Sequence, residues 1–129
     1  MYERKLPIDI DCGVTVTQLV IGGKWKPHLI NCITRGYRRP ADFQKIITGA
    51  TKRVLTHQLN ELEQMGVVRK TVYPVVPMKV EYFLTGLGES LVPVIRMMDD
   101  WGNRHRELFD ETGKCKSMPA HFPDAVRHV

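Results

Sequence analysis

The chain has 129 residues, of which 43% are hydrophobic, and its formal net charge is +5; this length and apolar content are typical of one domain with a single compact core. No apolar run is long enough to span a bilayer, and the charged first residues are not followed by the apolar stretch of a signal peptide, so we expect a cytoplasmic protein. Three scattered cysteines exclude a disulfide framework and a zinc site built from paired cysteines.

The positive charge is concentrated in the first two thirds of the chain. Residues 1–84 hold 13 Lys and Arg against 7 Asp and Glu, whereas residues 85–129 hold 6 against 7. Such a cluster is expected of a surface that docks on phosphates, although an ordinary solvated face has the same composition. The densest window, in which the only acid is Asp42, contains Arg35, Arg38, Arg39, Lys45, Lys52 and Arg53.

Two short helices are predicted after an irregular, polar arm at residues 1–11. The first spans residues 12–21, although its valines and threonines leave a strand open, and the pair Gly22-Gly23 ends it. The second begins near Lys24 and continues to about Thr34, because a proline is tolerated in the first turn of a helix. Its expected buried stripe is Leu29, Ile30 and Ile33, with Cys32 close to the core.

A third helix at residues 41–47 and a fourth at residues 51–65 are separated by the turn at residues 48–50. The third follows a basic turn that ends at Pro40, and its apolar set is Phe43, Ile46 and Ile47. Two helices joined by a tight, glycine-containing turn, with polar side chains on the second, form a helix-turn-helix plan.

The fourth helix has two different faces. Thr51 is a suitable N-cap, and Gly66 stands where a left-handed residue closes a helix. The outward side chains are of types that meet base edges or phosphates, although an amphipathic helix with a solvated polar face stays open. At about 100° per residue, the packing side holds Val54, Leu55, Leu59, Leu62 and Met65, and the outward side holds Arg53, Thr56, His57, Asn60 and Gln64.

Alternation replaces helical periodicity after Gly66. Residues 67–73 and 80–84 are predicted to form two strands of a hairpin, joined by a loop with prolines at positions 74 and 77. A hairpin that carries Arg69, Lys70 and Lys79 directly after such a helix has the sequence order of a winged helix. The alternative is a small hairpin that only covers the core.

A long final helix is predicted to begin at the cap residue Thr85, with a possible kink near Pro93. Its apolar stripe is longer than one small core requires, so we expect part of it to meet another copy of the chain. Cys115, His121 and His128 in the tail match no metal-ligand spacing. The stripe comprises Leu87, Leu91, Val94, Ile95, Met98 and Trp101, continued by His105 and Leu108.

Several blocks together resemble the HxlR-type winged-helix transcriptional regulators, which are related to the MarR group. They are IGGKWKP at 21–27, VLTHQLNELE at 54–63, GVV at 66–68, VYPVVP at 72–77, KVEYFLT at 79–85, GESLVPV at 88–94 and Trp101-Gly102. The resemblance implies a mainly helical α+β fold, a winged helix-turn-helix with extra N-terminal and C-terminal dimerisation helices. Residues 12–112 form this domain, between the arm and a tail at 113–129. Departures from the family pattern are Val75 and Met78 in the wing and His28 in the second helix.

The residue pattern and the resemblance together predict a dimeric bacterial regulator on a near-palindromic duplex DNA operator, without cofactor, metal or membrane partner. The nature of an inducer, small molecule or redox, stays open. The expected recognition-helix contacts are Thr51, Lys52, Arg53, Thr56, His57 and Asn60, the phosphate and wing contacts are Arg38, Arg39 and Lys79, and the dimer contacts are Leu19, Leu91, Ile95, Met98 and Trp101.

Two further expectations concern Cys12 and the class of function. Some members of this family sense oxidants or electrophiles with a cysteine just before the first helix, where Cys12 lies, and a helix N-terminus can lower a thiol pKa. An unreactive cysteine is the alternative, because no basic residue neighbours it in the sequence.

An enzyme is not expected, since no catalytic or phosphate-binding motif occurs. The remaining alternative is a winged-helix module that contacts protein or RNA without specific DNA binding.

Overall fold

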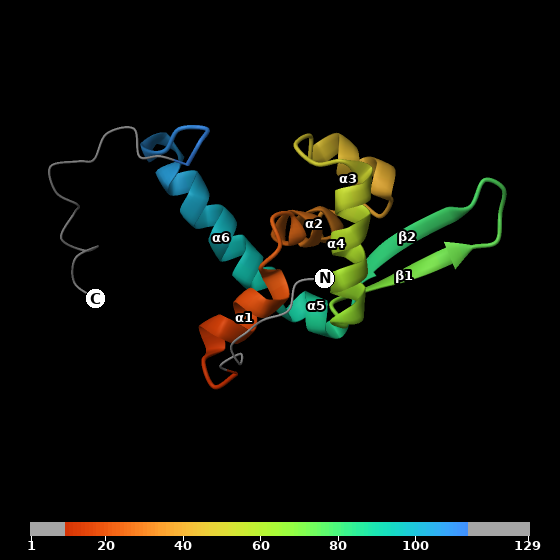
Figure 1. The fold of residues 1–129 in the computed structure, drawn as a ribbon, viewed down its shortest axis with the longest axis horizontal. Coiled ribbons are helices and arrows are strands. Elements are labelled where there is room, and N and C mark those ends of the chain that lie inside the picture. Colours follow the sequence, from red (N-terminus) through yellow and green to blue (C-terminus); the bar gives the residue numbers. More distant parts are fainter. Residues whose placement is uncertain (1–9, 114–129) are drawn as a thin grey trace, which may run out of the picture. The chain divides into compact units, whose positions relative to one another are not determined.

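The structure, a computed structural model, describes residues 10–113 (Figure 1). Residues 1–9 of the predicted arm (1–11) and the part of the tail with Cys115, His121 and His128 lie outside the described residues. The chain divides into two compact units, Met1–Ile95 and Arg96–Val129, which are considered separately. Along the described part of the chain, no helix has the length and apolar content needed to cross a membrane.

Four helices open the first unit: α1 (Gly13–Ile21), α2 (Lys26–Thr34), α3 (Pro40–Ile46) and α4 (Lys52–Gln64). All four were predicted within one or two residues at each end. The last three supply most of the core, because each offers an apolar stripe at helical spacing. Ile46, predicted to pack, is 42% exposed, so α3 contributes mainly Phe43. The buried apolar side chains of these four helices are Leu29, Ile30, Cys32, Ile33, Phe43, Leu55, Leu59 and Leu62.

The ends of α4 are fixed by the residues predicted to fix them. The Thr51 hydroxyl accepts a hydrogen bond from the Val54 N–H at 3.2 Å, and Gly66 has φ +78°. The predicted packing of Val54 is wrong, since its side chain is 40% exposed. Val54 lies about 100° around the helix from Leu55, outside the arc that faces the core.

The predicted hairpin is present as β1 (Val68–Tyr73) and β2 (Lys79–Leu84), paired antiparallel from Val68↔Leu84 to Tyr73↔Lys79. The hairpin extends away from α4 in Figure 1. Its base is attached to the core at Tyr82, which is 3% exposed and whose N–H donates to the Arg38 carbonyl at 2.8 Å. The two strands therefore leave the core at a fixed point beside α4.

The single long final helix predicted after Thr85 is wrong. Thr85 caps only the short helix α5 (Gly86–Ser90), and the chain turns at Leu91 before α6 (Val92–His105) and a 3₁₀ turn (Arg106–Leu108). Pro93 explains the interruption, because it has no N–H for the carbonyl four residues earlier and its ring clashes with that carbonyl.

Candidate nucleic-acid interface

The outward face of α4 holds the side chains predicted for DNA contact. Lys52, Arg53, His57 and Asn60 are exposed, whereas Thr56 is half-buried. Because the opposite face of α4 is packed in the core, the helix cannot rotate about its axis, and these side chains keep their outward orientation. The N-cap Thr51 is also exposed, at the beginning of the same helix.

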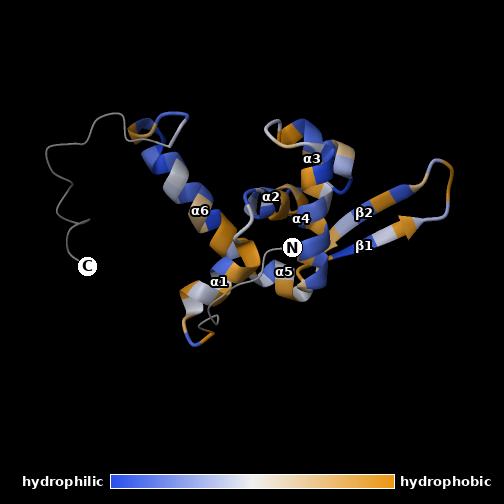
Figure 2. Cartoon of the chain, in the orientation of Figure 1, coloured by the Kyte–Doolittle hydropathy of each residue, from blue (hydrophilic) through white to orange (hydrophobic). Residues whose placement is uncertain are grey.

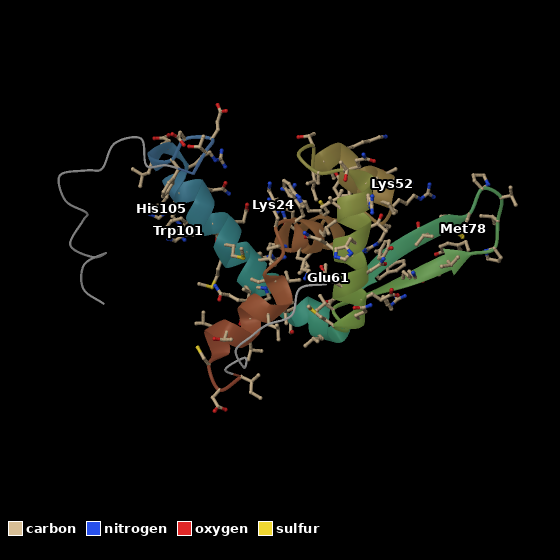
Figure 3. All side chains as sticks on the ribbon, viewed as in Figure 1. Lys24, Lys52, Glu61, Met78, Trp101 and His105 are labelled. Carbon is tan, nitrogen blue, oxygen red and sulfur yellow. The ribbon has the colours of Figure 1, made fainter. Side chains whose placement is uncertain are left out.

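A hollow of about 630 Å³ lies between α4 and the wing. It places Lys52 and Thr56 of α4 beside Arg39, which precedes α3, and Lys79, which begins β2. Four predicted DNA contacts from three separate segments thus line one groove. Figure 3 shows Lys52 on α4 and Met78 on the wing. The remaining lining is largely apolar: Pro40, Ala41, Val75, Val76, Pro77, Met78, Val80 and Tyr82.

Arg39 and the wing residue Lys79 share one acidic partner, Glu81, which was not predicted from the sequence. Oε2 of Glu81 lies 3.8 Å from Arg39 Nε and 3.8 Å from Lys79 Nζ. The Tyr73 hydroxyl donates to the other oxygen of Glu81 at 2.9 Å, and this hydrogen bond is the main reason that the pKa of Tyr73 is raised. Glu81 and Lys79 are two residues apart in one strand, a spacing that puts both on the same face and could have indicated the pair.

Arg38 differs from its neighbour Arg39 in its surroundings. Its guanidinium donates to the Ile33 carbonyl at 3.2 Å and lies over the Phe83 ring at 4.7 Å, and Arg69 lies over the same ring at 4.5 Å. Arg38 is half-buried, whereas the Arg39 side chain is 53% exposed. The structure therefore engages Arg38 with its own chain and leaves Arg39 the more accessible cation.

The tip of the wing is apolar. Val76 is fully exposed, Met78 is 71% exposed and Val75 is 52% exposed, and the tip appears orange in Figure 2. The departures from the family pattern at Val75 and Met78 therefore lie on the surface. The positive charge of the wing starts next to this tip at Lys79, which pairs with Tyr73, and continues toward the base with Lys70 and Arg69.

Cys12 is the N-cap residue of α1 and is partly exposed. Its side chain makes no capping hydrogen bond, but its pKa is lowered by the N–H of Thr15, then by the Thr15 hydroxyl and the N–H of Val14. Cys32 is buried as predicted; burial raises its pKa, against a smaller lowering by the charge of Arg35. The pKa values of the two thiols are thus shifted in opposite directions.

The predicted dimer contacts divide into buried and exposed residues. Ile95 is 5% exposed and belongs to the chain's own core, and Leu91 packs against that core. Met98 and Trp101 on α6 are 45% and 58% exposed. Leu19 is half-buried in α1, a helix that has no fully buried residue.

Within residues 10–113, no cluster of His, Cys, Asp and Glu could hold a metal ion.

Comparison with known proteins identifies the fold and its class of function. The family described as HxlR-like helix-turn-helix matches residues 20–110. The HTH-type transcriptional regulator YdeP of Bacillus subtilis is 44% identical over 117 residues, which cover 86% of this chain and 91% of YdeP. The HTH-type transcriptional regulator YybR of the same organism is 43% identical over 112 residues, 85% of this chain and 90% of YybR.

The solved structures agree with the sequence relatives. The redox regulator HypR in its reduced form matches with a TM-score of 0.70 at 44% identity, covering 74% of this chain and 95% of HypR. Its oxidized form gives 0.68 at 45% identity, covering 72% and 96%. The predicted winged helix-turn-helix fold is confirmed, and these relatives are regulators rather than enzymes. The chain belongs to the HxlR-like helix-turn-helix family of transcriptional regulators.

Proposed function

We propose that the chain binds a specific duplex DNA operator as a homodimer and thereby regulates transcription in the cytoplasm, where that DNA lies. The groove between α4 and the wing is the observation that carries this proposal. It collects Arg39, Lys52 and Lys79 around an apolar floor, a combination that suits a phosphate backbone with its sugars. α4 then enters the major groove beside it, as recognition helices do.

Within this proposal, base reading and phosphate binding fall to different residues. Arg53, His57 and Asn60 are exposed on α4 and have side chains suited to base edges. Thr51, Lys52 and Thr56 lie at the start of the same helix and complete the contact. The phosphate contacts are Arg39 and Lys79, with a smaller share for Arg38 because its guanidinium is already engaged.

We propose that the dimer contacts come from apolar side chains that are exposed or half-buried in their own unit: Leu19 and Leu91 in the first unit, and Met98 and Trp101 in the second. The functional domain is then residues 12–112. A two-fold dimer presents two recognition helices, so the operator is a near-palindrome with half-sites about 10 base pairs apart, or a multiple of that distance. Sedimentation at micromolar concentration, alone and on the operator, tests this assembly; a monomer in both measurements contradicts it.

DNA recognition is tested by titrating salt against binding to the operator and to random duplex DNA. Asn60→Ala should cost about 1–3 kcal/mol on the operator and little on random DNA, because it removes a base contact. Lys79→Ala should weaken both and reduce the salt slope by about one unit. Lys70→Ala is the matched control, since Lys70 lies in the same hairpin but, unlike Lys79, does not line the groove between α4 and the wing.

The outcomes separate DNA recognition from the alternative use of the fold. Equal losses on operator and random DNA for Asn60→Ala would mean that this residue only positions the protein. Absence of salt-dependent binding to any duplex would favour a winged-helix module for protein or RNA contact.

We also propose that modification of Cys12 changes operator affinity. The likeness to the redox regulator HypR and the lowered pKa of Cys12 support this. A lowered pKa gives more thiolate at a given pH, and the raised pKa of Cys32 gives less. Iodoacetamide should therefore alkylate Cys12 faster than Cys32 at neutral pH, with the difference measured by mass spectrometry of peptides.

The regulatory consequence needs a separate measurement. Operator affinity is compared before and after diamide treatment, in the wild type and in Cys12→Ser. Loss of affinity in the wild type alone supports a sensing role. Unchanged affinity after complete modification of Cys12 would make it an unreactive structural cysteine in function, and the signal would have to enter elsewhere.

A further inference from the structure

The segment between α1 and α2 lies directly against the side chains of α4. The Trp25 N–H donates to Gln58 Oε1 at 2.8 Å. A Cβ added at Gly23 would stand 3.0 Å from that same oxygen and 3.0 Å from Lys26 Cδ and Cε. This spacing is tighter than ordinary van der Waals contact, so only glycine fits here without displacing a neighbour. The segment from Gly23 to Lys26 is therefore docked on α4.

Lys26 is the charged residue at the centre of this contact. It is 5% exposed, and its Nζ lies 3.5 Å from Glu61 Oε1 on α4. Taking an ammonium group out of water is costly unless an opposite charge compensates it. The Glu61 carboxylate is consequently held near the buried end of Lys26 and is not free to sample its other rotamers.

The same carboxylate oxygen reaches the outward face of α4. Glu61 Oε1 is 3.6 Å from His57 Nε2, one helical turn earlier, and the His57 side chain is 75% exposed. Figure 3 labels Glu61 on α4. An exposed pair at this spacing is weak and leaves both side chains mobile. Here Glu61 also pairs with the buried Lys26, so the His57 imidazole has a partner that is held in place.

We propose that Lys26 is a specificity-determining positioning residue: it is buried and does not touch DNA, but through Glu61 it sets the place of the His57 imidazole on the reading face. The proposal rests on the DNA-binding function proposed above. Lys26 also compensates the charge of Glu61, which would otherwise repel phosphates near this face. Discrimination at one base pair of each half-site then depends on the lysine that begins α2.

The first experiment measures positioning without DNA. Lys26→Met alone removes the buried cation and leaves the Glu61 side chain, which is 40% exposed, solvated by water. Lys26→Met with Glu61→Gln removes both charges. The ring resonances of His57, recorded by ¹H–¹³C NMR, should shift in the single variant as well as in the double variant. Lys24→Met is the matched control, because Lys24 lies two residues before Lys26 but its ammonium stands 5.0 Å from the Trp25 ring centre; it should leave His57 unchanged. Unchanged His57 resonances in Lys26→Met overturn the proposal.

The second experiment is a mutant cycle on DNA discrimination. In the wild-type background, His57→Ala should reduce the preference for the operator over single-base variants by about fivefold at one position, the lower end of a base contact. In the Lys26→Met background, that preference is already lost, so His57→Ala should change it less than about twofold. Equal losses in both backgrounds overturn the proposal, because His57 would then act independently of Lys26.

These two readouts also separate this proposal from the one on which it rests. If the wild type prefers no duplex sequence, DNA recognition fails and the specificity claim for Lys26 fails with it. The NMR comparison still decides whether Lys26 and Glu61 position His57. Circular dichroism of the single and double variants confirms that both retain the helical fold before either result is interpreted.

Discussion

Helices α4 and α6 have similar lengths, 13 and 14 residues, and both carry an apolar stripe, yet they are buried differently. In α4 the side chains of Leu55, Leu59 and Leu62 are at most 1% exposed. In α6 only Ile95 is buried, whereas Met98 and Trp101 are exposed. Periodicity thus defines which face of a helix is apolar, but it does not define what covers that face.

The difference corresponds to two tasks. The packed face of α4 fixes the helix in its own chain, so its polar face is held in one orientation for a ligand. The exposed stripe of α6 has the composition of a surface that another copy of the chain would cover. Figure 2 shows the apolar colour on parts of both helices, which hydropathy alone cannot distinguish.

The largest effect that separates the two helices is expected for Leu59→Ala in α4. Leu59 is fully buried, so removing its side chain should lower the free energy of unfolding by about 2–5 kcal/mol. Urea denaturation followed by circular dichroism measures the change. The loss should not depend on protein concentration, because the cavity forms within one chain. Met98→Ala is the matched change in α6, and it should cost less than about 1 kcal/mol once the protein is dilute.

A smaller effect, on association, is expected for Trp101→Asp in α6. The Trp101 side chain is 58% exposed and stacks on His105 at 4.6 Å. A charge there should weaken dimerisation at least tenfold, about 1.4 kcal/mol, while the helical signal stays. Sedimentation velocity measures it, with Arg104→Gln as a control of equal charge change on the same helix. Unchanged association would remove α6 from the proposed dimer surface.

Much of the first unit could be predicted because its signals are local. The cap at Thr51, the left-handed Gly66 and the apolar spacing of α2 each depend on a few neighbouring residues. The sequence predicted a kink near Pro93 but not the full break before α6, because the apolar series continues through Leu91 and Val94. A single proline there outweighed a periodic pattern that otherwise favours one helix.

The rest depends on contacts between residues far apart in the sequence. Lys26 and Glu61 are 35 positions apart in the sequence. The Arg38 guanidinium lies over the ring of Phe83, which is also distant in the sequence. Nothing in the local sequence distinguishes Arg38 from Arg39, although only the first lies over an aromatic ring. The predicted interface residue Ile95 lies in the core for the same reason, since the stripe does not say where the chain's own core ends.

The smallest effect is expected for Thr51→Ala, which changes the N-cap of α4 and not its packed face. Thr51→Ala removes the hydroxyl that accepts from the Val54 N–H at 3.2 Å, so the free energy of unfolding should fall by about 1 kcal/mol. Thermal denaturation measures this against Thr48→Ala, a change to an exposed threonine in the preceding turn. Because the freed N–H lies at the start of the proposed recognition helix, operator affinity should fall as the first turn frays. Equal stability of the two variants would mean that packing of Leu55, rather than the cap, fixes the beginning of α4.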